Sequence, residues 1–351
     1  MRPFKVVILK HGYASTEIER RIVTAAGGEL IDTDALPDAQ RFAVAEQADA
    51  LILRWDQVTA PMIARLRQCR IIVRYGVGYD NVDYEAATAD GIIIGHAPNY
   101  CQDEVAAHTV ALWLACVRGV VTAHEFLAHG GWHDNPVCRL HRLSGQTFGL
   151  IGLGGIGRAV ARRLAGWGLH LLANDPYVEP TEAAAVGADL VELATLLRHA
   201  HHISLHVPLL PETRHLLASE EFALLKPGAV LVNTARGPLL HTAALVNAVR
   251  SGHVSAAGLD VFEAEPLPPD SPLRRQERII LTNHTAWYSE ESQAELQRTV
   301  AEEAVRVCTG GLPRAIANPE VLHRLGRFAE WTPTENARWR WKRAAAIASR
   351  T

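Results

Sequence analysis

The 351-residue sequence contains no uninterrupted apolar run of about 18 residues, the length that a membrane-spanning helix needs. Met1 leads directly into a strand-like apolar run and shows no signal-peptide pattern. The formal net charge is only −3 at pH 7, so the chain has no overall field to attract nucleic acid or an anionic membrane. We therefore expect a soluble, cytoplasmic protein with neither a membrane nor a nucleic acid as partner.

Cysteine is also scarce. The five cysteines are scattered and form no CxxC pair: Cys69, Cys101, Cys116, Cys138 and Cys308. This pattern argues against a disulfide framework and against a zinc site. We expect a reduced protein without a bound metal.

The length exceeds what one hydrophobic core usually serves, and the chain shows two series of alternating strand and helix signals. In the first series, apolar runs at 4–10, 48–54, 70–76 and 91–97 predict buried strands. Thr16, with Glu19 three residues later, has the spacing of a capping box and predicts the start of a helix. Buried strands that alternate with helices are typical of a parallel sheet covered on both faces.

A helical pattern at 103–117 leads to the second series, which begins at Thr147. Its predicted strands are TFGLIG, LHLLAND, HHISLHV, AVLVNTA, AAGLDV and IILTNH, a number that matches the doubly wound dinucleotide-binding arrangement. A long helix beginning at Ser289 and ending at Gly310 and Gly311 lies beyond this series, and we expect it to pack back on the first.

A glycine motif, GLGGIG at 152–157, follows the strand TFGLI and opens a helix. In this context Gly152 allows the tight turn, Gly154 lets backbone approach a pyrophosphate, and Gly157 lets helix and strand pack closely. Asp175 follows 18 residues after Gly157, where an acid can accept hydrogen bonds from ribose hydroxyls. The alternative is an aspartate that merely starts a turn before Pro176. No basic residue follows at once, so the motif favours NAD over NADP.

These patterns predict an α/β fold of two doubly wound parallel-sheet domains. A Rossmann NAD-binding domain (102–286) would be inserted in a flavodoxin-like substrate domain (1–101 and 287–318). The remaining segment, 319–351, contains Trp331, Trp339, Trp341, Arg338, Arg340, Lys342 and Arg343. Its composition favours a surface extension. The alternative is a tail that docks on a neighbouring subunit or closes over the cleft.

Three segments end predicted strands at the edge where such sheets bind ligands: NTARG (233–237), LDVFEAEP (259–266) and TNHTAWYSE (282–290). Together they offer a guanidinium, a carboxylate and an imidazole. Reduction of a 2-oxo acid needs a cation to hold the carboxylate and an acid with a near-neutral pKa to protonate the oxygen. A carboxylate beside the imidazole stabilises its charged form. One histidine among 17 is unremarkable, but the triplet after a dinucleotide motif predicts an enzyme.

These segments, with GLGGIGR, HVPLLPETRHLL and LLKPGAVLVNTARG, resemble the D-isomer-specific 2-hydroxyacid dehydrogenase family over about residues 1–318. Within the family, VRYGVGYDNVD (73–83) and HTAWYSEES (284–292) resemble the C-terminal-binding-protein branch. That branch contains both bacterial dehydrogenases and NAD-sensing transcriptional corepressors.

The resemblance implies that Arg236 orients the substrate, that His284 is the acid/base and that Glu265 is the partner of His284. It implies that backbone N–H groups of Val77 and Gly78 receive the substrate carboxylate. The other predicted cofactor contacts are Thr109, Gly155, Ile156, Arg158, Pro176, Tyr177, His206, Val207, Pro208, Thr213, Thr234, Ala235 and Asp260, with Arg236 and His284 also at the cofactor. The family also implies a homodimer formed through an arm near 120–146.

The sequence departs from the family pattern at four positions. Asn283 stands where proline usually precedes the catalytic histidine, and Pro238, His241 and Leu210 replace a small residue, an acid and a threonine. None of these changes removes a reacting group. They bring loop details and the substrate into question rather than the reaction class.

The substrate side is less defined. Arg74 and Arg54 both end predicted strands, although Arg54 could equally be an ordinary surface arginine. With Tyr75 and Trp287, they suggest a pocket of cations and aromatic walls. We hypothesise a 2-oxo diacid or phosphonopyruvate-like substrate whose second anionic group meets Arg74. Alternatively, Trp287 forms an apolar wall for an aliphatic or aromatic side chain.

Two other functional classes remain open. The first is an NAD(H)-sensing corepressor or scaffold whose chemistry is vestigial, although the retention of Arg236, Glu265 and His284 favours an enzyme. The second is an NAD enzyme for another anion, such as formate or phosphite. The YGVGYDN loop together with HTAWYSE favours a 2-oxo acid.

Overall fold

The computed structural model describes residues 3–132 and 139–330, which form two compact units. One comprises the chain up to Tyr100 together with the segment from Ser289 onward, and we call it the split unit. The other runs from Cys101 to Tyr288, and we call it the central unit. The divisions lie within two residues of the boundaries drawn from the sequence at 101/102 and 286/287.

The split unit contains a five-stranded parallel sheet in the order β2-β1-β3-β4-β5. Its strands are β1 Lys5–Ile8, β2 Glu29–Asp32, β3 Ala50–Leu53, β4 Ile71–Arg74 and β5 Ile93–His96. Every residue of β3 and β5 is buried, because helices cover both faces of the sheet. The order is that of a flavodoxin-like sheet.

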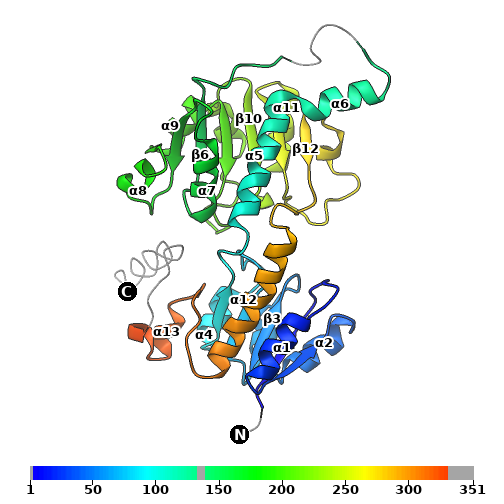
Figure 1. Cartoon of the computed structure of the whole chain (residues 1–351), viewed down its shortest axis with the longest axis vertical. Helices are drawn as coiled ribbons and strands as arrows, with labels where there is room; N and C mark the ends of the chain where they lie inside the picture. The colour runs from blue at the N-terminus through cyan, green and yellow to red at the C-terminus, as the bar shows by residue number, and fades with distance from the viewer. Residues whose placement is uncertain (1–2, 133–138, 331–351) are drawn as a thin grey trace. The chain divides into compact units, whose positions relative to one another are not determined.

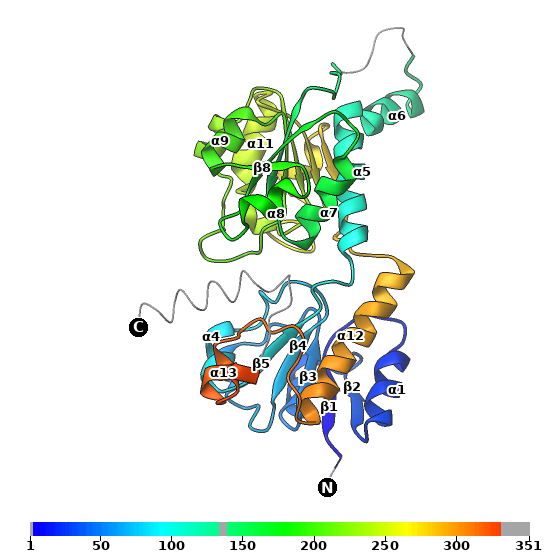
Figure 2. The same ribbon diagram turned by 60° about the vertical axis from the view of Figure 1, so that its left-hand side comes forward.

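Two long segments that are distant in sequence cover one face of this sheet. Helix α1 (Glu17–Ala25) packs beside α12 (Glu290–Cys308), and α12 lies against β3, β4 and β5 (Figure 1). Helices α2 (Asp38–Ala45), α3 (Ala60–Ile63) and α4 (Tyr84–Ala89) share a core cluster with strand residues such as Leu51. Figure 2 shows α4 and α12 with strands of this sheet between them. A short helix, α13 (Val321–Arg324), follows α12.

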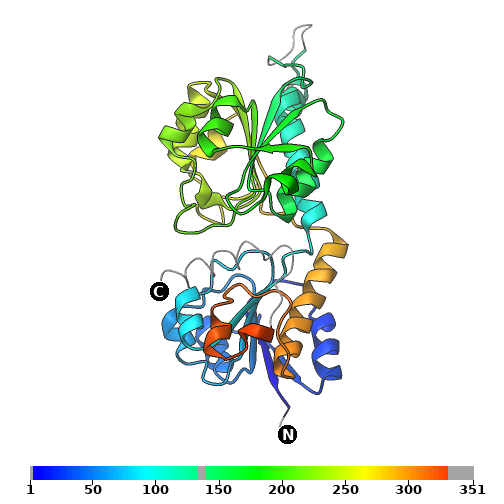
Figure 3. The same cartoon turned by 90° about the vertical axis from the view of Figure 1, so that its left-hand side faces the viewer.

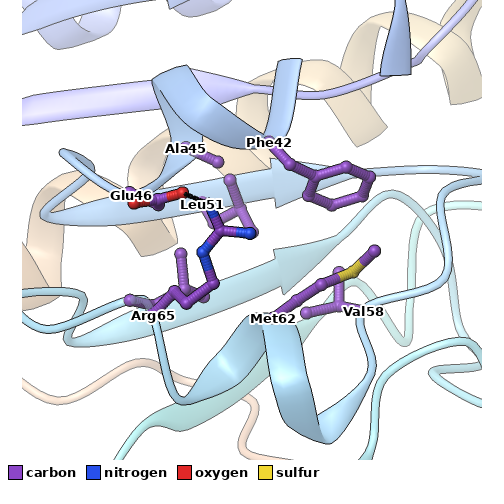
Figure 4. A pocket seen from close by; sticks show the side chains of 8 residues that line it. Phe42, Ala45, Glu46, Leu51, Val58, Met62 and Arg65 are labelled. Carbon is purple, nitrogen blue, oxygen red and sulfur yellow. Dashed lines mark ion pairs between the residues drawn. The ribbon is translucent and has the colours of Figure 1, made fainter. Parts of the chain in front are cut away.

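The region between α2 and α3 is closely packed. Phe42, Val58 and Met62 converge on a cavity of about 10 Å³, and the Glu46–Arg65 ion pair lies at its side (Figure 4). Such a volume holds about one water molecule at most. This part of the split unit is therefore a core without room for a substrate.

The central unit contains a seven-stranded parallel sheet in the order β12-β11-β10-β9-β6-β7-β8. Its strands are β6 Thr147–Ile151, β7 His170–Asn174, β8 Ala188–Leu190, β9 His202–Leu205, β10 Ala229–Asn233, β11 Val254–Leu259 and β12 Ile279–Leu281. The chain order reverses between β6 and β9, and ligands bind at the carboxyl ends of the strands at such a switch point. The predicted pair of doubly wound parallel-sheet domains is confirmed.

Helices cover both faces of this sheet, as Figure 3 shows edge-on. Helices α5 (Gln102–Arg118), α7 (Gly155–Leu164) and α8 (Pro180–Ala184) bury one core cluster, and α9 (Leu193–His199), α10 (Ser219–Leu224) and α11 (Thr242–Arg250) bury the other. Of the described 3-10 turns, Gly237–Leu239 and Pro272–Arg275 lie in this unit, and Phe328–Glu330 lies in the split unit. Helix α6 (Val120–Ala128) follows α5 after a left-handed Gly119.

Within residues 3–132 and 139–330, no single helix is long and apolar enough to cross a bilayer. Helices α5 and α6 meet the length and composition test only as a pair, which is bent by 61°. The buried residues of α5, such as Trp113, belong to a core cluster of the central unit.

Two local predictions need correction. Thr16 precedes α1 but does not cap it, because its hydroxyl donates to Asp32 Oδ2 at 2.9 Å instead. Strands β2 and β8 were also missed, since the sequences ELID and ADL are short and carry acidic side chains at sheet edges. The predicted arm near 120–146 includes residues 133–138, which lie outside the described residues, as do Cys138 and the tail residues 331–351.

Candidate active site

The glycine motif forms the turn between β6 and α7. Gly152 has a φ of +95°, and a Cβ there would lie 2.7 Å from the carbonyl carbon of His206. A Cβ at Gly157 would collide with the carbonyl oxygen of Gly152, so the first turn of α7 can lie against the strand only with glycine there. No atom lies within 4 Å of a Cβ built at Gly154. The turn is tight where it meets protein and open where a ligand would approach.

This arrangement fits a dinucleotide. The first turn of α7 begins at Gly155 and presents its unpaired N–H groups beside the open Gly154. Asp175 follows β7 and lies next to the turn, where its Oδ2 accepts from the N–H of Leu153 at 2.8 Å and its Oδ1 accepts from the N–H of Tyr177 at 3.0 Å. Asp175 is thus fixed at the position where an acid can meet ribose hydroxyls.

The other residues predicted to contact the cofactor lie either at the carboxyl ends of strands in the central unit or on helices α5 and α7. The hydroxyl of Thr213 donates to the carbonyl of Pro208 at 2.7 Å and closes the loop after β9. Thr109, on α5, shares a hydrogen bond of 2.8 Å with Thr234 at the end of β10. Arg158 donates to the carbonyl of Leu153 at 2.9 Å, which holds the glycine turn from within its own helix. Every predicted contact with the cofactor stays a prediction, including those of Ile156, Pro176, His206, Val207 and Ala235.

Arg236 is presented by a loop whose shape depends on Asn233, a residue that the sequence analysis did not single out. The buried Asn233 amide donates to the carbonyl of Arg236 at 2.8 Å and accepts from the N–H of Ala235 at 3.0 Å. Gly237 follows because any side chain there would strike the backbone of Phe262. The guanidinium donates to the carbonyl of Ala235 at 2.8 Å. The loop therefore holds Arg236 at the end of β10.

His284 and Glu265 are brought together from two different strand ends. His284 Nδ1 lies 2.6 Å from Glu265 Oε2, and the other carboxylate oxygen accepts from the N–H of Phe262 at 2.9 Å. The side chains are 37% and 35% exposed, so both are accessible. Because Nδ1 faces the carboxylate, Nε2 is the ring atom left to meet a substrate.

The electrostatics of the pair follow from this contact. Burial by itself raises the pKa of Glu265, but the hydrogen bond and charge of His284 outweigh burial and hold that pKa below its usual value. The nearby guanidinium of Arg236 acts in the same direction. Glu265 is therefore held as a carboxylate beside the ring of His284.

Asp260 organises the turn that carries His284. Its carboxylate accepts from the Thr282 hydroxyl at 2.6 Å and from the N–H groups of Thr285 and Ala286 at 2.9 Å each. Its carbonyl accepts from the N–H of His284 at 2.8 Å, and His284 has a left-handed φ of +56°. Nothing in the local sequence marks Thr282, since its role depends on contacts between strands.

The residues of the split unit that were predicted to bind substrate lie at the end of β4 and in the loop after it. Gly76 has a φ of +132°, and a side chain there would strike the guanidinium of Arg74, which lies against this loop. The carbonyl of Val77 bonds to Nδ1 of the buried His96 at 2.8 Å. Gly78 follows in the same loop, so the backbone predicted to receive a carboxylate is held in place.

The prediction of a side-chain contact from Tyr75 to the substrate is corrected. Tyr75 is only 1% exposed, and its hydroxyl donates to Glu19 of α1 at 2.7 Å. Its ring therefore turns into the helix layer. The indole N–H of Trp287 donates to the carbonyl of His284 at 3.0 Å, so the edge of this ring holds the catalytic turn.

Comparison with known proteins identifies the family. Residues 110–286 match the model of the D-isomer specific 2-hydroxyacid dehydrogenase, NAD binding domain. The chain is 36% identical over 295 residues to a glyoxylate reductase of Korarchaeum cryptofilum, covering 82% of this chain and 89% of that protein. It is 38% identical over 293 residues to a D-3-phosphoglycerate dehydrogenase of Methanocaldococcus jannaschii, covering 83% of this chain and 56% of that protein. The chain thus spans about half the length of the phosphoglycerate dehydrogenases that it matches.

Solved structures agree in fold. A glyoxylate reductase from Paecilomyes thermophila is 26% identical with a TM-score of 0.81, covering 90% of this chain and 99% of that one. The family model and the fit of the glycine turn identify NAD as the cofactor. The chain belongs to the D-isomer specific 2-hydroxyacid dehydrogenase family.

Proposed function

We propose that the protein is an NAD-dependent D-2-hydroxyacid dehydrogenase that works as a 2-oxo acid reductase. The observation that carries this proposal is the 2.6 Å contact between His284 Nδ1 and Glu265 Oε2, at the same sheet edge as the glycine turn. An accessible imidazole with a fixed carboxylate partner is the acid/base that carbonyl reduction needs. No described feature favours the corepressor alternative.

The residues would divide the chemistry as follows. NADH would supply the hydride in reduction, and NAD+ would accept it in oxidation. His284 would hold a proton at Nε2 and give it to the substrate oxygen while hydride reaches the carbon, and Glu265 would stabilise the charged ring before the transfer. Arg236 would hold the substrate carboxylate and polarise the carbonyl with its planar guanidinium. Oxidation of the hydroxy acid reverses these proton movements.

We propose a small 2-oxo acid with a second anionic group as the substrate. Arg74 supports this, since its guanidinium lies on the loop of Val77 and Gly78 that would receive the first carboxylate. Arg54 is the weaker candidate, because it already donates to the carbonyl of His11 at 3.1 Å and stacks on the ring of Trp55 at 4.3 Å. The names of the relatives point to both a one-carboxylate substrate and a phosphorylated one.

A substrate panel tests the reaction class. The purified protein is mixed with NADH or NADPH and with glyoxylate, hydroxypyruvate, pyruvate, oxaloacetate, 2-oxo-4-methylthiobutyrate or phosphonopyruvate, and loss of the reduced cofactor is followed. We expect turnover of at least one acid with NADH preferred, because Asp175 would repel a 2′-phosphate. Absence of turnover with every acid and both cofactors would refute the proposal.

The second-anion hypothesis needs its own comparison. Arg74→Ala should lower kcat/KM for oxaloacetate or phosphonopyruvate at least about tenfold more than for glyoxylate, because a lost charge-assisted hydrogen bond costs about 1.5–3 kcal/mol. Arg54→Ala serves as the matched control. Equal losses for both kinds of substrate in Arg74→Ala would remove the hypothesis.

We also propose that the enzyme is a cytoplasmic homodimer. Four described cysteines are buried and in no disulfide, which suits a reducing compartment: Cys69, Cys101, Cys116 and Cys308. Helix α6 and the residues after it expose large apolar side chains, including Leu127 at 56% and Trp132 at 79%. A surface of this kind suits an interface. Light scattering of Trp132→Asp against the natural chain would test the dimer, which should dissociate.

A further inference from the structure

His108 of α5 touches the turn that carries the acid/base. Its Nε2 lies 3.0 Å from the hydroxyl oxygen of Thr282 and 3.7 Å from Oδ1 of Asp260. Its side chain is 26% exposed, whereas that of Asp260 is only 1% exposed. The imidazole is therefore the outer member of a short chain of polar groups that ends on a buried carboxylate.

The direction of the hydrogen bonds in this chain is fixed by the number of protons. The Thr282 hydroxyl has a single proton and donates it to Asp260 Oδ1 at 2.6 Å. Its oxygen can therefore only accept in the contact with His108, so Nε2 of His108 carries a proton. The chain reads from His108 N–H to the Thr282 hydroxyl to the Asp260 carboxylate.

Asp260 in turn holds the conformation of the catalytic turn. Its two carboxylate oxygens and its carbonyl accept from four groups between residues 282 and 286, including the N–H of His284. The left-handed backbone of His284 is unfavourable for a residue with a side chain. Asn283 precedes it, and asparagine leaves φ free where a proline would fix it. The hydrogen bonds to Asp260 must therefore hold the backbone of this turn, because no proline restricts it.

Helix α5 is a firm base for this support. The residue next to His108, Thr109, bonds to Thr234 at the end of β10 at 2.8 Å, and α5 packs on β10, β11 and β12. Two adjacent residues of α5 thus contact the ends of two strands. Thr109 contacts the end of β10, next to the Arg236 loop, and His108 contacts the residue after β12, at the His284 turn. Side chains fixed by packed elements hold a site more precisely than loops do.

We propose that His108 is a positioning residue for His284, acting through the Thr282 hydroxyl and Asp260. The expected effect of His108 on turnover rests on the proposed function, whereas its expected effect on the position of the His284 ring does not. It predicts that loss of the His108 donor lets the turn relax and moves the imidazole from the geometry for proton transfer. NADH binding at the glycine turn should be largely unaffected.

The kinetic test compares His108→Leu with His108→Gln. Leucine removes the donor, and we expect kcat for 2-oxo acid reduction to fall roughly three- to tenfold, with the KM for NADH changed by less than about twofold. Glutamine can still donate an N–H and should recover most of the loss. His199→Leu, at the exposed end of α9, is the matched control and should leave kcat unchanged, because this ring bonds only to the carbonyl of Thr195 in its own helix. Equal loss in the leucine and glutamine variants would overturn the proposal.

Thr282→Val tests the same hydrogen bond from its other end with little change of shape. It should lower kcat at least as much as His108→Leu, and the double variant should be no slower than Thr282→Val alone, because both changes break one chain. Multiplied losses in the double variant would contradict the proposal. This arm also decides the question if His108→Leu does not fold.

Nuclear magnetic resonance of the histidine rings separates this inference from the proposed function. In the protein without ligands, His108→Leu should shift or broaden the ¹H–¹⁵N ring signals of His284, whereas His199→Leu should not. An unchanged His284 ring would overturn the positioning role even in an active enzyme. A changed ring in a protein that reduces no 2-oxo acid would uphold the positioning role and refute the proposed function.

Discussion

Each unit contains a histidine paired with a carboxylate, but the two pairs differ in access. In the split unit, His11 Nε2 lies 3.2 Å from Asp32 Oδ1, and the histidine side chain is only 3% exposed. In the central unit, His284 Nδ1 lies 2.6 Å from Glu265, and both side chains are more than a third exposed. A partner makes an imidazole a better base, but only the accessible ring can exchange a proton with a substrate. The first pair therefore serves stability and the second can serve catalysis.

The central unit also contains the opposite case, a buried histidine without a partner. His202 of β9 is 4% exposed, and neither ring nitrogen has a hydrogen-bond partner within the described residues. Its ring packs against those of Trp113 and Phe148. Burial, with a smaller contribution from His201, lowers the pKa of His202 to about 4. The two units should therefore respond to acid in opposite directions at these histidines.

The largest expected effect separates the two pairs by catalysis. His284→Ala should lower kcat by about two to four orders of magnitude, the usual contribution of a positioned acid/base. His11→Gln should leave kcat within about twofold, because its ring serves the split unit's structure. Steady-state reduction of the best 2-oxo acid measures both. Comparable losses of kcat in the two variants would contradict the distinction between a catalytic and a structural histidine pair.

The next effect concerns the partner of the catalytic histidine. Glu265→Gln should lower kcat roughly ten- to hundredfold and change the pH dependence of reduction, because the amide cannot supply the negative charge that Glu265 places beside the ring. The measurement is kcat against pH for both proteins. Glu263→Gln is the matched control, because Glu263 instead bonds to His215 and to the N–H of Thr242. A pH profile of unchanged shape would show that Glu265 and His284 are not coupled.

A third effect concerns stability and the unpaired His202. Its folded pKa of about 4 lies below the unfolded value of 6.5, so the unfolded state binds the proton first and stability falls as pH drops from about 6.5 to 4. His202→Phe removes this penalty, which reaches about 3 kcal/mol at pH 4. In denaturant unfolding, the free energy of unfolding of His202→Phe should rise relative to that of the natural protein as pH falls. A difference in the free energy of unfolding that does not depend on pH would contradict the lowered pKa of His202.

The smallest effect has the opposite pH dependence. Burial by itself lowers the pKa of His11, but the hydrogen bond and charge of Asp32, with the charge of Asp34, raise it above 6.5. A raised folded pKa adds stability that is fully present below about 6.5 and is lost as pH rises through the folded value. His11→Gln should therefore destabilise the protein more at pH 6 than at pH 9. A larger loss of stability in His11→Gln at pH 9 than at pH 6 would contradict the opposite pH dependence of the two units.

The parts of the fold that the sequence predicted are those governed by local pattern. Buried runs such as ALIL of β3 leave few alternatives, and GLGGIG requires its turn because no residue with a Cβ fits at Gly152 or Gly157. The sequence did not predict strands β2 and β8, because their stability comes from pairing with neighbouring strands rather than from their own apolar residues. Edge strands of this kind carry little pattern.

The site divides in the same way. Arg236, Glu265 and His284 could be predicted because their chemistry and their places after strands are visible in sequence. The residues that hold them could not, because Asn233, Thr282 and His108 act through contacts between elements far apart in the chain. Tyr75 was assigned to the substrate because of its neighbours in sequence, whereas Glu19 of α1 draws its hydroxyl inward.

The most direct test of the central claim is a crystal structure with NADH and oxamate, an unreactive 2-oxo acid analogue. We expect His284 Nε2 within about 2.6–3.2 Å of the oxygen that mimics the keto group, with Arg236 on the carboxylate and the contact between Glu265 and Nδ1 preserved. A His284 ring turned away from oxamate, or separated from Glu265 in the complex, would contradict the account.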